Sequence, residues 1–382
     1  MATTTTASYC FIGTGFSNSF GPAPIHLAEI TPSSISIIHT FSSPSSNPSC
    51  IVSHPTSPIL YIVDETRFGT VQAITYSNPT LSSPTSPPTL TPLATPISST
   101  GRVPCHISLS SAGAGAGFLL VSNYIEGSVA VLPLTPRLSL SPATDSKAHQ
   151  YCAKDGYASL QDRQEHSHAH CAVVSPNGNF ALVADLGLSK VFSYDFDSSR
   201  GSLQGSFDSS RHLQLRRDCG ARHLAFSKYG DFVYVTCEMT STLAIASFDE
   251  GTGNLELVEE LSTLPPNQKP TRDHHRGDST VVVSPSGKFV YVGVRVCDPG
   301  LIAVFEVEGG GKLTLVGHES TRGSVPRHFA HIAGFLVVAN QESGNLVLFL
   351  VDEEGDGVGG LKFLDECECP GDGKPTCIAQ AF

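Results

Sequence analysis

The sequence predicts an all-β fold, a seven-bladed β-propeller in which the N- and C-terminal strands share one blade and close the ring. Three observations predict it: a strand–turn–strand unit that recurs along the chain, a partial copy at the N-terminus, and one further apolar strand at the C-terminus. The chain has 382 residues. All-β folds of this size commonly form one domain, so we expect a single domain over residues 1–382.

The recurring unit is an apolar strand, a Ser-Pro-Xaa-Gly-like turn, a second apolar strand, a polar turn and a third strand. Clear copies run from Cys171 to Asp197 and from Thr280 to Glu308. Between copies, the second strands recur about every 46 to 62 residues, with their middle residues at Val63, Val121, Val183, Val235, Val292 and Val338. A β-sandwich would not repeat one unit in this way, and a β-solenoid would use shorter repeats.

The two ends of the chain are expected to complete the seventh blade. The segment YCFIGTGFSNSF, from Tyr9, is a partial copy of the unit, and KPTCIAQAF, from Lys374, has the pattern of one more strand. Two segments interrupt the repeats, the Ser/Thr/Pro-rich residues 77–100 and the polar residues 133–165. Because they offer few apolar side chains to bury, we expect them to be exposed connecting loops.

Composition and charge argue against several kinds of partner. The net charge is −12, from 35 acidic and 23 basic residues, which disfavours nucleic acid but leaves room for a small anion beside a few arginines. No apolar run is long enough to span a membrane, and the first ten residues lack the pattern of a secretory signal. The 11 scattered cysteines are expected to be reduced thiols of a cytoplasmic protein. The sequence leaves the oligomeric state open.

Polar residues recur at the ends of the apolar strands, where packing does not require them. They are His106, His170, Arg222, His223, Arg327 and His328 around the start of first strands, and Asp185, Glu238, Arg295 and Gln341 after second strands. In equivalent blades both sets lie at one end of the ring, where they would form a concave site. A purely structural role, in capping strands or binding turn amides, stays open for His106, His328 and Asp185.

Arg222, Glu238 and Arg295 each interrupt an apolar run, and burying such charges without partners is costly. Together with His170 they are the predicted catalytic residues. A histidine beside a carboxylate can act as a general base, and arginines hold anionic groups or a developing oxyanion. This set suits the opening or closing of a lactone on a small anionic substrate. The sequence has no P-loop, no nucleophile elbow and no zinc-binding His-Glu-Xaa-Xaa-His motif, so we expect no cofactor and no metal.

Five segments, taken together, carry a family resemblance. They are PCHISLS from Pro104, HAHCAVVSPNGNFALVADLGLSKVFSYDFD from His168, ARHLAFSKYGDFVYVTCEMTSTLAIASFD from Ala221, VVVSPSGKFVYVGVR from Val281, and PRHFAHIAGFLVVANQESGNLVLF from Pro326. The chain resembles the seven-bladed β-propeller lactonases, which comprise bacterial-type 6-phosphogluconolactonases and fungal carboxy-cis,cis-muconate cyclases. The resemblance covers most of the chain between Pro104 and Phe349.

The resemblance implies roles for the same four residues. In the cyclases, His170 and Glu238 would correspond to base and acid, and Arg222 and Arg295 would hold carboxylates. In a phosphogluconolactonase, His170 would activate water and the arginines would hold the phosphate and the oxyanion. Neither activity is known to need a metal in this family.

Three functions therefore remain in view. The first is a metal-independent lactonase acting on a small anionic sugar lactone, which we favour. The second is a lactone-forming isomerase of the muconate cyclase type, and the third is a propeller scaffold without enzymatic activity. His106, Asp185, His223, Arg327, His328 and Gln341 are the expected substrate-binding residues, and for a phosphate group the sequence offers Arg102, Arg272, Arg276 and Arg327.

Overall fold

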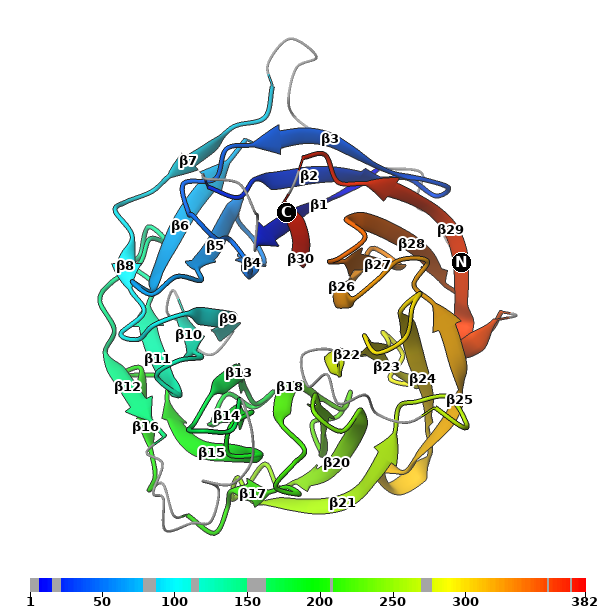
Figure 1. The fold of residues 1–382 in the computed structure, drawn as a ribbon. Coiled ribbons are helices and arrows are strands. Elements are labelled where there is room, and N and C mark those ends of the chain that lie inside the picture. Colours follow the sequence, from blue (N-terminus) through cyan, green and yellow to red (C-terminus); the bar gives the residue numbers. More distant parts are fainter. Residues whose placement is uncertain are drawn as a thin grey trace.

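The computed structural model describes residues 7–15, 22–77, 87–110, 117–149, 163–206, 209–268, 277–355, 357–371 and 373–382. These residues form seven antiparallel sheets, arranged as blades around a central axis (Figure 1). The predicted seven-bladed β-propeller is therefore confirmed. No helix among these residues is long and apolar enough to cross a membrane.

Six blades are built from consecutive strands, and in each the first strand lies nearest the axis (Figure 1). In chain order, the first two of these blades consist of β4 (Ile51–Ser53), β5 (Ile59–Asp64), β6 (Thr70–Tyr76), β7 (Leu90–Pro92) and β8 (Ile97–Ser98), and of β9 (Pro104–Ser110), β10 (Phe118–Asn123), β11 (Ser128–Pro133) and β12 (Asp145–Ala148). The next two consist of β13 (Ala169–Val174), β14 (Phe180–Asp185), β15 (Lys190–Asp197), β16 (Ser202–Gln204) and β17 (Leu213–Gln214), and of β18 (Ala221–Phe226), β19 (Phe232–Cys237), β20 (Thr242–Phe248) and β21 (Leu255–Ser262). The last two consist of β22 (Asp278–Val283), β23 (Phe289–Val294), β24 (Leu301–Val307) and β25 (Leu313–Ser320), and of β26 (Pro326–Ile332), β27 (Phe335–Asn340), β28 (Asn345–Val351) and β29 (Leu361–Glu368). Two short 3-10 turns, Gly309–Gly311 and Val358–Gly360, precede β25 and β29.

The seventh blade joins the two ends of the chain. The strands β1 (Ser8–Gly15), β2 (Ile25–Ile30) and β3 (Ile35–Phe41) come from the N-terminal part, and β30 (Lys374–Gln380) takes the innermost place beside β1. In this pairing Ile12 lies opposite Ile378, and both side chains are buried in the apolar layer shared with the neighbouring blade. The expected closure of the ring by both termini is confirmed, and it fixes the inner strands around one channel.

The two segments expected to be connecting loops contribute strands to the blades. Within residues 77–100, β7 and β8 pair with β6 at the outer edge of their sheet, and within residues 133–165, β12 pairs with β11. Residues 78–86 and 150–162 of these segments lie outside the described residues. The outermost strand of a blade is largely exposed to solvent, so it lacks the apolar alternation by which a strand is predicted from sequence.

Candidate active site at the mouth of the channel

The innermost strands share an irregularity where the chain enters each blade. In β13 the pairing with β14 skips one residue between Ala169 and Cys171, so His170 is the extra residue of a β-bulge. The same shift lies around Cys105 in β9, around Arg222 and His223 in β18, and around Arg327 in β26. A bulge redirects the extra side chain away from the sheet's regular alternation. Here it brings residues from four blades to one end of the channel.

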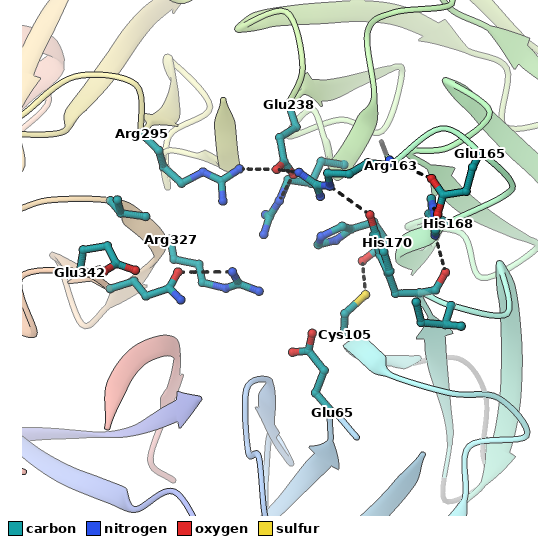
Figure 2. Close-up of a pocket in the computed structure, with 15 residues that line it drawn as sticks. Glu65, Cys105, Arg163, Glu165, His168, His170, Glu238, Arg295, Arg327 and Glu342 are labelled. Atoms are coloured by element: carbon teal, nitrogen blue, oxygen red, sulfur yellow. Dashed lines mark hydrogen bonds and ion pairs between the residues drawn. The ribbon is translucent and has the colours of Figure 1, made fainter. Parts of the chain in front are cut away.

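These residues border a hollow at the end of the channel, which we call the mouth cavity. It has a volume of about 470 Å³, a size suited to a small metabolite. Figure 2 shows the polar side chains that surround it. It is lined by Glu65, Cys105, Tyr124, Ile125, Arg163, Glu165, His168, His170, Arg222, Glu238, Arg295, Val325, Arg327, Gln341 and Glu342.

A single buried carboxylate, Glu238, is shared by three arginines. Its Oε1 lies 2.8 Å from Arg295 Nη2 and 2.5 Å from Arg163 Nη1. Its Oε2 lies 2.8 Å from Arg222 Nε, an ion pair without hydrogen-bond alignment. The side chains of Glu238, Arg222 and Arg295 are at most 4% exposed. Three positive charges therefore meet one negative charge in a nearly dry environment, which leaves the cluster with a positive excess.

Backbone carbonyl groups hold two of these arginines in place. Arg222 Nη1 donates to the carbonyl oxygen of Ser279 at 2.7 Å, and Arg295 Nε donates to that of Gly277 at 2.8 Å. The backbone of Gly277 passes so close to Glu238 that a Cβ at Gly277 would lie 1.2 Å from the Glu238 carbonyl oxygen. A glycine is required for this close approach, so the position of Arg295 and that of Glu238 are set together.

The charges of the cluster determine its protonation states. Burial alone would raise the pKa of the Glu238 carboxyl, but Arg163, Arg295 and Arg222 outweigh it and hold that pKa well below its usual range. Burial, followed by repulsion from Arg295, lowers the pKa of Arg222 to about 9. Glu238 is therefore ionised near neutral pH, and Arg222 still carries its proton.

His170 lies beside this cluster as a neutral imidazole. Burial, followed by the charge of Arg222, lowers its pKa well below the usual 6.5. Its Nδ1 has no hydrogen-bond partner within the described part of the chain, while its ring contacts the ring of Tyr124 edge-on, with centroids 5.8 Å apart. His170 lines the mouth cavity, and a neutral imidazole in a polar cavity can accept a proton from a bound molecule.

Three predicted substrate-binding histidines lie elsewhere than expected. His106, His223 and His328 line a second, deeper cavity of about 230 Å³, which we call the channel cavity. Each comes directly after a residue that lines the mouth cavity, namely Cys105, Arg222 and Arg327. The side chain that follows the bulge points further down the channel, so these histidines are not placed to contact a molecule in the mouth cavity.

The deeper histidines connect blades to one another. Ile378 donates its backbone N–H to His328 Nδ1 at 3.3 Å, and His223 Nδ1 lies 3.3 Å from Thr280 Oγ1 on the next blade. Burial lowers the pKa of His106 to about 3 and that of His328 to about 4, so both are uncharged. Ala172 of the next blade donates its backbone N–H to His106 Nδ1 at 3.5 Å, so the structural role that the sequence left open for His106 and His328 fits these contacts.

Asp185 also differs from the expectation of a substrate contact. It is fully buried and does not line the mouth cavity. One oxygen accepts from His149 Nδ1 at 2.7 Å and from the Ser167 hydroxyl at 2.8 Å, and the other accepts from the His168 N–H at 2.8 Å. Asp185 therefore anchors the segment that leads into β13, and its effect on the cavity is indirect.

The remaining predicted residues, Arg327 and Gln341, do line the mouth cavity, and Arg327 Nη1 lies 3.3 Å from Gln341 Oε1. Of the other arginines considered for a phosphate, Arg102 is exposed and paired with Glu126. Arg272 and Arg276 lie outside the described residues.

The sequence analysis missed Arg163 as a site residue. It lies in the polar segment 133–165, yet its guanidinium reaches Glu238 and donates from Nε to the Tyr124 hydroxyl at 3.1 Å.

Glu65 was also missed as a site residue, although it lines the mouth cavity. Burial raises the pKa of its carboxyl. The one signal in the sequence for Glu65 and Tyr124 is their place directly after a second strand, which they share with Glu238 and Arg295.

The fold and this cavity define a propeller with a charged site at one end of its channel. The family model described as "Lactonase, 7-bladed beta-propeller" matches residues 11–378. The chain therefore belongs to the seven-bladed β-propeller lactonase family, as the resemblance implied.

Two relatives with assigned names are similar in sequence. The 6-phosphogluconolactonase of Bacillus subtilis (strain 168) is 33% identical over 257 residues, which cover 66% of this chain and 68% of that protein. The 6-phosphogluconolactonase of Formosa agariphila is 27% identical over 66% of this chain and 68% of that protein.

Solved structures agree over nearly the whole chain. The periplasmic gluconolactonase PpgL of Pseudomonas aeruginosa is 25% identical with a TM-score of 0.81, covering 99% of both chains. A protein from Lactobacillus plantarum is 23% identical, also with a TM-score of 0.81, and covers 99% of this chain and 100% of its own.

The Glu238 cluster generates a prediction about stability. Glu238→Gln leaves three buried guanidinium groups without their counter-charge, so we expect a loss of about 3 to 5 kcal/mol in the free energy of unfolding. Urea denaturation followed by circular dichroism measures it. The matched control is Glu126→Gln, which removes an exposed partner of Arg102 and should cost about 1 kcal/mol or less. Equal losses for the two variants would contradict the description of Glu238 as the centre of the cluster.

Proposed function

We propose that the protein is a metal-independent lactonase that hydrolyses a small anionic sugar lactone, with 6-phosphogluconolactone as the leading substrate. The observation that carries the proposal is a neutral histidine that lines the mouth cavity beside a cluster of three arginines and one carboxylate. The names of the relatives described above support the same activity. The positive excess of the three arginines around Glu238 suits a substrate that brings its own negative charge.

In the proposed reaction, His170 acts as general base. A water molecule attacks the lactone carbonyl carbon while the imidazole of His170 accepts its proton, which gives a tetrahedral oxyanion and an imidazolium. Arg222, whose charge acts most strongly on His170, would face the oxyanion. Collapse of this intermediate breaks the ring C–O bond, and the imidazolium returns its proton to the leaving oxygen. The product is the open-chain acid.

We assign the anionic substituent to Arg295 and Arg327, with Gln341 alongside. Arg295 and Arg327 lie across the mouth cavity from His168 and Glu165 (Figure 2). Guanidinium groups bind phosphate in a bidentate manner, and a phosphate held there would leave the lactone ring to extend toward His170. Positions for both ends of the substrate are thus available within one cavity.

Glu238 receives a positioning role in place of the acid role that the resemblance suggested. A general acid must carry a proton, whereas three arginines favour the ionised form of Glu238. As a carboxylate it fixes the directions of Arg222 and Arg295 and lets them lie close together despite their like charges. His170 then serves as base in the first step and as acid in the second.

The two other functions have less support. The assigned names of the relatives above are lactonases, which favours hydrolysis over cyclisation of the muconate type. A propeller that serves only as a scaffold does not need the buried cluster of three arginines around Glu238.

We also propose a cytoplasmic location, in line with the many unpaired thiols among the described residues. Cell fractionation tests this proposal against the periplasmic location of the Pseudomonas relative.

Hydrolysis of freshly generated 6-phospho-δ-gluconolactone, measured against its spontaneous rate, tests the proposed function. We expect the wild type to accelerate it and His170→Ala to lower kcat by at least about 100-fold, the contribution typical of a general base. His328→Ala is the matched control, since this buried histidine lines the channel cavity, and its kcat should stay of wild-type order. Full activity in folded His170→Ala would remove His170 from the reaction.

The pH dependence of kcat/KM gives a second prediction. His170 must be neutral to accept a proton, and its pKa is lowered well below 6.5. Activity should therefore persist as the pH falls through 6.5 and decline only at lower pH, where the imidazole becomes protonated. Rates corrected for spontaneous hydrolysis across pH 4 to 8, a range that spans the ordinary histidine pKa of about 6.5, measure this. An acid limb at or above 6.5 would contradict a buried, neutral base.

A further inference from the structure

At the edge of the mouth cavity, one short segment gathers three potential metal ligands. His168 Nε2 lies 3.1 Å and His166 Nε2 lies 3.6 Å from the same oxygen, Oε1 of Glu165. Among the described residues these three form a group whose ligand atoms all lie within 4.8 Å of one another. Two bonds of about 2.0 to 2.1 Å to one tetrahedral zinc ion place ligand atoms about 3.3 Å apart, so the observed separations are close to those of a binding site.

The hydrogen bonds of the two rings fix which nitrogen faces the carboxylate. His168 Nδ1 lies 3.0 Å from the carbonyl oxygen of Tyr124, and His166 Nδ1 lies 2.7 Å from that of Ser167. A carbonyl oxygen can only accept, so both Nδ1 atoms carry hydrogen, and in the neutral rings both Nε2 atoms present lone pairs. Donation from the second nitrogen to a backbone carbonyl is the usual arrangement of a histidine that binds a metal.

Three potential ligand atoms therefore converge: Glu165 Oε1 lies at hydrogen-bond distance from His168 Nε2 and 3.6 Å from His166 Nε2. One divalent cation would satisfy all three atoms at once.

The segment is held in this shape by contacts outside the cluster. Glu165 Oε2 accepts from the Arg163 N–H at 2.8 Å, which turns Oε1 toward the histidines. The Ser167 hydroxyl donates to Asp185 at 2.8 Å, and the His168 ring stacks on Tyr124 with centroids 4.2 Å apart. The ligands are thus oriented by the surrounding structure, as in a built metal site.

We propose that Glu165, His166 and His168 form a binding site for a first-row divalent cation of the zinc type. Two imidazoles and one carboxylate are a ligand set that such ions prefer, and three protein ligands leave a fourth position for water. From the sequence we expected no metal, because it contains no zinc-binding His-Glu-Xaa-Xaa-His motif. The cation is assigned no step in lactone hydrolysis, and the site stands or falls independently of that activity.

Zinc binding tests the proposal directly. Tag-free wild type, stripped with a chelator, is dialysed against Zn²⁺ and its metal content is measured alongside His166→Ala, Glu165→Gln and the control His54→Ala. His166 and Glu165 are accessible to solvent, so their variants should fold, which circular dichroism checks. We expect one zinc ion per chain in the wild type and in His54→Ala. In His166→Ala and Glu165→Gln the affinity for zinc should be at least about tenfold weaker, since loss of a residue that only orients a ligand already weakens metal binding by about tenfold.

Cobalt(II) provides an independent readout of the ligands. Bound in place of zinc, it should show visible absorption of a four- or five-coordinate ion, without the near-ultraviolet thiolate band that cysteine ligands would add. No zinc binding by wild type would overturn the proposal. Equal binding by wild type, His166→Ala and Glu165→Gln would also overturn it, as would a thiolate band or an equal loss in His54→Ala.

Discussion

The sharing of the Glu238 carboxylate among three arginines is the interaction on which the rest of the site depends. Arg222 comes from the innermost strand of Glu238's own blade, Arg295 from the next blade, and Arg163 from the segment that leads into the preceding blade. Without the carboxylate these guanidinium groups would repel one another across a nearly dry space. With it, a positive excess is held at one end of the channel.

The positive excess has consequences for the neighbouring base. It lowers the pKa of His170, together with burial, and so keeps the imidazole neutral at the cost of making it a weaker base. A bound anionic substituent would offset part of that positive charge and thereby raise the basicity of His170. Binding of the substrate's anionic group would thus raise the pKa of His170 and make it a stronger base, which couples recognition of the anion to catalysis.

The sequence predicted the repeat, the closure of the ring and the four central residues, because all of these follow from regular positions in the blades. His170, Arg222, Glu238 and Arg295 stand where apolar strands begin or end, and the structure brings them together in the mouth cavity. The depth of His106 was not predictable, since the bulge at Cys105 adds one residue and carries the next side chain down the channel. A bulge leaves no reliable mark in a sequence.

Two other differences have similar physical causes. Arg163 belongs to an irregular segment outside the repeat, so its direction depends on the tertiary structure alone. Asp185 is the last residue of its second strand, one place before the position that Glu238 takes after its own strand, and it holds Ser167 and the backbone of His168. Consecutive positions at the end of a second strand can thus support the cavity or line it, and the sequence does not show exactly where each strand ends.

The most direct test of the account is the binding of the stable open-chain acids to His170→Ala by calorimetry, comparing 6-phosphogluconate with gluconate. If the arginines recognise an anionic substituent, the phosphorylated acid should bind at least about tenfold more tightly, a difference of about 1.4 kcal/mol, and the difference should shrink as salt is added. Equal affinities, or a preference for gluconate at low salt, would contradict the assignment of the mouth cavity to an anionic sugar lactone.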